Sequence, residues 1–195
     1  MSERKELLER LGIYSKTLTI SKSTQPSLEK GKVVSFKVCP RKVWVLRSAL
    51  ISLGHPVSCR AKSLMERDTL FPPLREHSTD VIIVSVGDLG FRDGAEYRQI
   101  RMAATDELHL WLCPAQIALA LRIIYGDQPK NERVHIAMDT IPFLYKNKIA
   151  YGIFVVGRAG KRFYLDADEI RSDDFFAAEH LFAFVRPPQH KLLQS

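Results

Sequence analysis

The spacing of apolar residues along the chain alternates between a helical and a strand-like period, and these periods divide the chain into predicted helices and strands. Helical spacing predicts helices at residues 2–11, 41–53, 61–70, 94–106 and 114–125. We expect Asp93 and Glu96 to form a capping box at the start of the fourth helix. Apolar residues cover most of the circumference of the last helix, so we expect the core to enclose it.

Alternating or continuous apolar runs predict strands at residues 31–38, 81–86, 109–112, 134–138, 143–145, 149–156, 162–165 and 182–186. The run VIIVSV at Val81–Val86 is continuous, which is typical of a strand buried on both faces. We expect 182–186 to form a final edge strand, because Pro187 and Pro188 follow it. The pattern predicts an α+β fold, with a mainly antiparallel sheet and a few helices packed on it.

A stiff sequence, Phe71-Pro-Pro-Leu74, is the best candidate for a boundary within the 195 residues. It predicts a basic N-terminal segment or small subdomain over 1–77 and an α+β domain over 78–195. The alternative is one compact domain, since a chain of this length can bury a core of its own.

Composition excludes several classes of protein. Hydrophobic residues make up 46% of the chain and charged residues 26%, which is globular rather than disordered composition. The longest apolar run, Trp111–Leu121, is too short to cross a bilayer, so we expect no membrane contact. The charged start of the chain does not resemble a secretory signal, and three scattered cysteines do not form a disulfide framework. We therefore expect a cytoplasmic protein.

Positive charge is concentrated near the N-terminus. Residues 1–75 hold 15 basic and 6 acidic side chains, whereas residues 76–195 hold 14 and 16, which together give the net charge of +7. Such asymmetry indicates an anionic partner more strongly than a uniform excess does.

Five cations in this basic third are the candidate nucleic-acid-binding residues: Arg41, Lys42, Arg47, Arg60 and Lys62. Arg41 and Lys42 lie at the start of a predicted helix, where the helix dipole favours negative charge, and a bound phosphate would explain them. The leading hypothesis is a non-enzymatic binding or interaction protein whose partner is nucleic acid or an acidic protein. A solvated basic face is the simpler reading, because no known nucleic-acid-binding motif accompanies these charges.

Cys113 suggests an alternative, a small cytoplasmic enzyme with a cysteine nucleophile. A thiol at a helix N-terminus can have a lowered pKa, which favours the reactive thiolate. His109 lies four positions earlier, and in a strand it would be about 13 Å away, so a general base would have to come from elsewhere. Free cysteines are also commonly buried and inert.

We expect no metal and no cofactor. The pairs His55/Cys59 and His109/Cys113 supply the ligand count of a zinc site, but neither has the spacing that wraps one ion. The glycine-containing turn at 87–94 lacks the residue order of a phosphate-binding loop.

Several stretches resemble a group of uncharacterised small bacterial proteins. They are Val86-Gly-Asp-Leu-Gly-Phe-Arg-Asp-Gly-Ala95, Leu112-Cys-Pro-Ala115, Asp127-Gln-Pro129 and Ile136-Ala-Met138. The resemblance covers a little over half the chain. It implies a bacterial protein and carries no activity with it.

Aromatic residues gather in the predicted hairpins: Tyr145, Tyr151, Phe154, Phe163 and Tyr164. They could line a ligand pocket or a stacking surface. For the two phenylalanines we expect core positions, because alternation along a strand turns half of its side chains inward.

Overall fold

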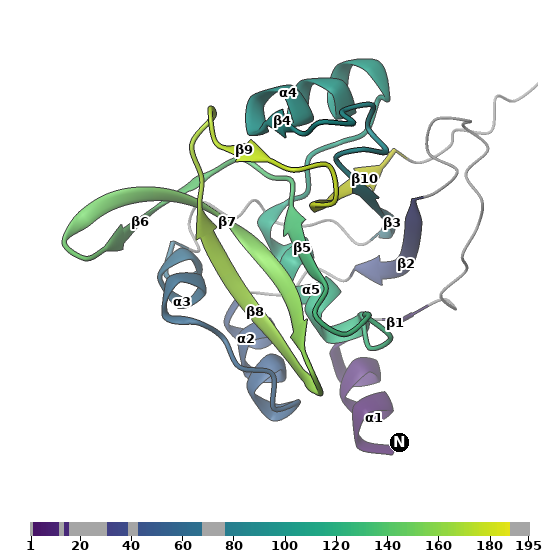
Figure 1. The fold of residues 1–195 in the computed structure, drawn as a ribbon. Coiled ribbons are helices and arrows are strands. Elements are labelled where there is room, and N and C mark those ends of the chain that lie inside the picture. Colours follow the sequence, from purple (N-terminus) through teal and green to yellow (C-terminus); the bar gives the residue numbers. More distant parts are fainter. Residues whose placement is uncertain (1, 12–13, 16–30, 39–42, 68–76, 188–195) are drawn as a thin grey trace, which may run out of the picture.

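The computed structural model describes residues 2–11, 14–15, 31–38, 43–67 and 77–187, in which one large sheet packs against helices (Figure 1). The helices are α1 (Ser2–Leu11), α2 (Val43–Ser52), α3 (Cys59–Met65), α4 (Tyr97–Met102), the π-helical turn η3 (Ala103–Glu107) and α5 (Ala115–Ile124). The large sheet holds β1 (Tyr14–Ser15), β2 (Lys32–Val38), β3 (His77–Ser85), β5 (Arg133–Ile136), β6 (Ile141–Tyr145), β7 (Lys148–Ala159), β8 (Arg162–Glu169) and β10 (Leu181–Arg186). A separate pair consists of β4 (Ala95–Glu96) and β9 (Phe175–Phe176).

The large sheet has the strand order β1-β2-β3-β10-β5-β7-β6, with β8 also paired to β7. Its pairs are antiparallel except for β10 with β5, which run parallel. The predicted α+β class with a mainly antiparallel sheet is confirmed.

The core lies between this sheet and α5. All ten residues of α5 are buried, as the apolar circumference of its sequence predicted, and the helix contacts β7 and β8. In the central strands β3 and β10, consecutive residues are buried, because both faces of the sheet are covered there. No helix in the described part of the chain is long and apolar enough to span a membrane.

Elements on both sides of residue 78 share this core. The whole of β2 pairs with β3, and α2 contacts α5. One cluster of buried residues extends from Leu11 to Val185. The sequence Phe71–Leu74, which suggested the boundary, lies outside the described residues.

Two predicted strands differ from the structure. Residues 109–112 form no strand, because His109 has a left-handed φ of 52° and only Trp111 makes an isolated bridge, to Val185. Residues 182–186 form part of β10, which is a central strand between β3 and β5 and not an edge. A sequence pattern reports burial, but the position of a strand in its sheet depends on distant pairing partners.

The predicted cap at Asp93 is also displaced. Ala95 and Glu96 are held extended by pairing with β9, so the helix begins only at Tyr97. Glu96 is the N-cap, and its backbone N–H donates to Gln99 Oε1 at 2.9 Å. The helix predicted over 94–106 is therefore shorter, and it continues as the π-helical turn η3.

Candidate functional site

A hollow of about 450 Å³ lies where α2, α3 and the start of β8 meet. We call it the basic hollow, because Arg47 of α2, Lys62 of α3 and Arg162 of β8 all line it. The other residues that line the hollow are Ile51, Gly54, His55, Pro56 and Val57. The structure thus brings two of the five predicted cations together and adds a third from a distant part of the chain.

The turn between α2 and α3 shapes one wall of the hollow. Gly54 has a φ of 68°, a left-handed conformation that commonly ends a helix. The N–H groups of Gly54 and His55 donate to the carbonyls of Ile51 and Leu50, both at 2.9 Å. This closes α2 and redirects the chain, so Arg47 and Lys62 on successive helices face a common space.

Arg162 reaches the hollow because the segment before α3 adds to the edge of β8. Ser58 N–H donates to the Leu165 carbonyl and Leu165 N–H to the Pro56 carbonyl, both at 3.0 Å. The ring of His55 also lies 5.6 Å from that of Phe163, between their centroids. These contacts fix the first residue of β8 beside the α2–α3 turn, an arrangement that no local sequence pattern signals.

The three cations of the basic hollow are not paired with acidic side chains in the described part of the chain. Within the described residues, no ion pair involves Arg47, Lys62 or Arg162. Arg47 is half-buried, and the other two are exposed. Converging like charges of this kind create a positive potential that attracts anions.

Arg60, also predicted as a binding residue, belongs to a different arrangement. Its guanidinium lies 3.5 Å from an oxygen of Asp166 and 3.8 Å from one of Asp168. Asp168 also accepts hydrogen bonds from Arg133 at 2.7 Å and from His135 at 3.1 Å. The charge of Arg60 is therefore balanced within an acidic and basic network on β8. Arg41 and Lys42 lie outside the described residues.

The lowered pKa of Asp168 keeps the carboxyl at the centre of this network ionised. Burial by itself raises the pKa of Asp168, but hydrogen bonds from His135 and Arg133, together with their charges, outweigh burial and bring the pKa down to about 2. Asp168 is thus a carboxylate at neutral pH and holds its cationic neighbours in place.

An exposed aromatic residue lies beside the basic hollow. Trp44 is 63% exposed and precedes Arg47 by three residues on α2, so the two side chains are neighbours on one helix face. Ile51, also exposed, continues this face into the hollow. A tryptophan in this position can stack on a planar group.

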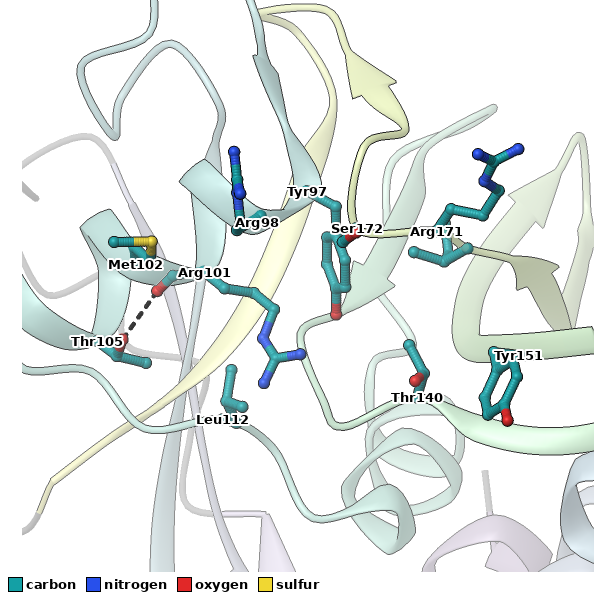
Figure 2. A pocket seen from close by; sticks show the side chains of 11 residues that line it. Tyr97, Arg98, Arg101, Met102, Thr105, Leu112, Thr140, Tyr151, Arg171 and Ser172 are labelled. Carbon is teal, nitrogen blue, oxygen red and sulfur yellow. Dashed lines mark hydrogen bonds between the residues drawn. The ribbon is translucent and has the colours of Figure 1, made fainter.

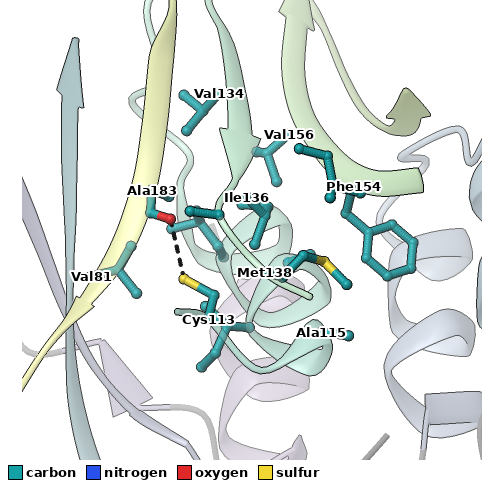
Figure 3. Close-up of a cluster of buried hydrophobic side chains, with 14 of the residues drawn as sticks. Val81, Cys113, Ala115, Val134, Ile136, Met138, Phe154, Val156 and Ala183 are labelled. Atoms are coloured by element: carbon teal, nitrogen blue, oxygen red, sulfur yellow. Dashed lines mark hydrogen bonds between the residues drawn. The ribbon is translucent and has the colours of Figure 1, made fainter. Parts of the chain in front are cut away.

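Cys113 lies in the core, as Figure 3 shows, among Val81, Ile136 and Met138. Its thiol donates to the Ala183 carbonyl at 3.3 Å, and burial strongly raises its pKa. A protonated, enclosed thiol lacks what a cysteine nucleophile needs. In the described part of the chain, no three His, Cys, Asp or Glu side chains are arranged to hold a metal ion.

The hairpin aromatics divide between core and surface. Phe154 is buried, as expected. Phe163, for which a core position was also expected, is only half-buried and lies beneath Arg122 and Arg158, whose guanidinium carbons are 4.6 and 4.9 Å from its ring centroid. Tyr151 is exposed and lines a second pocket.

Comparisons with known proteins gave no relative for this geometry: no family model matches the chain, and neither a curated protein nor a solved structure matches it.

Proposed function

We propose that this chain is a non-enzymatic binding protein that holds single-stranded nucleic acid at the basic hollow. The observation that carries the proposal is the convergence of Arg47, Lys62 and Arg162 on one surface, with no acidic partner among the described residues. Lysine and arginine side chains bind phosphate oxygens without reading sequence, so we expect general affinity for the backbone.

The exposed indole of Trp44 supports a single strand as the partner. Bases of a single strand are free to stack on an aromatic ring, whereas those of a duplex are stacked on one another. Trp44 and Arg47 together offer a stacking surface next to a phosphate contact. This combination of cations and an aromatic ring is typical of proteins that bind single strands.

We place this activity in the bacterial cytoplasm. The resemblance of residues 86–95 and 112–115 to small bacterial proteins supports the source. The exposed, unpaired thiol of Cys59 supports a reducing compartment.

The test is the affinity for a labelled oligonucleotide, measured by fluorescence anisotropy at low salt. Replacing Arg47, Lys62 and Arg162 together with Gln should weaken binding at least about tenfold, because three charge-assisted contacts are lost. Replacing Trp44 with Ala should weaken binding to a single strand about tenfold and leave binding to a duplex unchanged.

A matched control separates the site from overall charge. Lys130, Lys146 and Lys148 are exposed, do not line the basic hollow, and take part in no ion pair within the described residues. Their combined change to Gln lowers net charge by the same amount and should leave affinity within about threefold. Equal losses in the two triple variants would contradict the proposal, as would binding to an acidic protein but to no nucleic acid.

A further inference from the structure

A second pocket, of about 520 Å³, lies beside α4 and η3 and shares no residue with the basic hollow (Figure 2). We call it the α4 pocket. Its walls come from α4, from the segments before α5 and β6, from β7 and from the chain after β8. Segments distant in sequence thus meet around one cavity, which has the volume of a small-molecule site.

Arg101 of α4 is the central polar group of this pocket. Figure 2 shows its guanidinium extending into the space between Tyr97 and Leu112. The guanidinium donates to Asp139 Oδ1 at 2.8 Å, and its carbon lies 5.7 Å from the centroid of the Tyr97 ring. That ring is fixed in turn, because Tyr97 is buried and its hydroxyl donates to the Met138 carbonyl at 3.0 Å. The cation is therefore positioned before any ligand arrives.

Most donors of the Arg101 guanidinium remain free for a ligand. A guanidinium has five N–H groups, and the bond to Asp139 is the one side-chain hydrogen bond that it makes in the described part of the chain. The Asp139 side chain is 88% exposed, so water screens its charge and it neutralises Arg101 only weakly. A phosphate or carboxylate can take two parallel hydrogen bonds from such a group.

The other arginines at this pocket are directed away from its interior. Arg98 lies 3.6 Å from Glu96, and Arg171 lies 3.1 Å from Asp173. In Figure 2 the guanidinium groups of Arg98 and Arg171 both point away from the guanidinium of Arg101. The interior therefore matches one anionic group and not a chain of them.

The remaining walls suit a flat apolar body. Tyr151 of β7 is 54% exposed and lines the pocket, where Figure 2 shows it next to Thr140. Leu112 adds an aliphatic surface and Thr140 a hydroxyl. A ring seated against Tyr151 would remove apolar area of both partners from water.

The backbone just after Arg101 is also unusual. The π-helical turn η3 begins two residues further on, at Ala103, and the Thr105 hydroxyl donates to the Arg101 carbonyl at 3.0 Å. Single π-helical turns occur often at functional sites, where they redirect side chains.

We infer that the α4 pocket binds a small aromatic phosphate, with the anionic group on Arg101 and the ring against Tyr151. This site is separate from the basic hollow and does not depend on the proposed function.

Isothermal titration of the full chain tests the inference, with phenyl phosphate and adenosine monophosphate as probes. At least one of them should bind saturably, inorganic phosphate should bind at least about tenfold more weakly, and free adenosine should bind more weakly still. Arg101→Gln and Tyr151→Ala should each weaken binding about tenfold, through the lost charge-assisted hydrogen bonds and the lost stacking surface respectively. Tyr151 is exposed, so its variant keeps the test decisive if Arg101→Gln does not fold.

Asp139→Asn gives a result of opposite sign. It removes a negative charge next to the bound anion and should strengthen binding about twofold. Weaker binding by Asp139→Asn would contradict the placement of the anion beside Asp139. The triple change of the basic hollow to Gln should leave these affinities unchanged, which separates the two sites. The inference is overturned if neither aromatic probe binds at millimolar concentration, if Tyr151→Ala has no effect, or if inorganic phosphate binds equally well.

Discussion

Replacing Asp168 with Asn removes the charge at the centre of the β8 network and keeps the shape of the side chain. The pKa of this carboxyl falls from 3.8 to about 2, a difference that corresponds to about 2 kcal/mol of stability when the group is ionised. Its side chain is 23% exposed, so solvent screening reduces this value only modestly. The variant should therefore be about 1 to 2 kcal/mol less stable than the wild type at pH 7.

The sign of the pH dependence follows from the lowered pKa. A carboxyl whose folded-state pKa lies below the unfolded one stabilises the fold above the unfolded pKa, and this contribution disappears as pH falls through the folded pKa. The difference between wild type and Asp168→Asn should thus still be present at pH 5 and shrink between about pH 4 and 2. Urea unfolding followed by circular dichroism at a series of pH values measures it.

Asp139→Asn is the matched control for this experiment, because Asp139 also pairs with an arginine but is 88% exposed. It should change stability by no more than about 0.5 kcal/mol at any pH. If the Asp168 variant is as stable as the wild type at pH 7, or if its deficit persists unchanged to pH 2, the reasoning about the network is wrong.

Two further predictions concern the core. Iodoacetamide should modify the exposed Cys59 in the native protein and leave Cys113 unmodified. The substitution Cys113→Ala should lower the free energy of unfolding by about 1 kcal/mol and leave nucleic-acid binding intact. Peptide mass mapping that finds Cys113 alkylated at the rate of an exposed thiol would contradict this prediction. The substitution Leu121→Asp should abolish cooperative unfolding, because it places a carboxylate on a helix that is buried on all sides. A thermal unfolding transition near that of the wild type would show that α5 is not a central core element.

The elements that could be predicted from sequence are those in which nearly every residue is buried. The run Val81–Val86 and the apolar residues of 114–125 correspond to β3 and α5, which the core covers on both faces or all round. Residues 109–112 have the same apolar character, yet the left-handed backbone of His109 prevents a strand. The hydrophobic pattern of a sequence indicates which residues are buried, but it does not indicate such a local change of backbone direction.

The candidate site depended more on tertiary contacts than on local sequence. Arg47 and Lys62 could be found from the charge of the basic third, since both lie on helices that one turn connects. Arg162 could not, because it joins them only through the hydrogen bonds of Pro56 and Ser58 to the edge of β8. Arg60 carries the same charge in the sequence, but its ion pairs to β8 became visible only in the fold.

The salt dependence of binding tests the central claim most directly. Each phosphate contact on a single strand contributes a slope of about −0.7 to a plot of log affinity against log salt concentration. If Arg47, Lys62 and Arg162 each contact a phosphate, their combined change to Gln should make the slope shallower by about two units, whereas the Lys130/Lys146/Lys148 control should not alter it. Equal slopes for the wild type and the basic-hollow variant would contradict the claim.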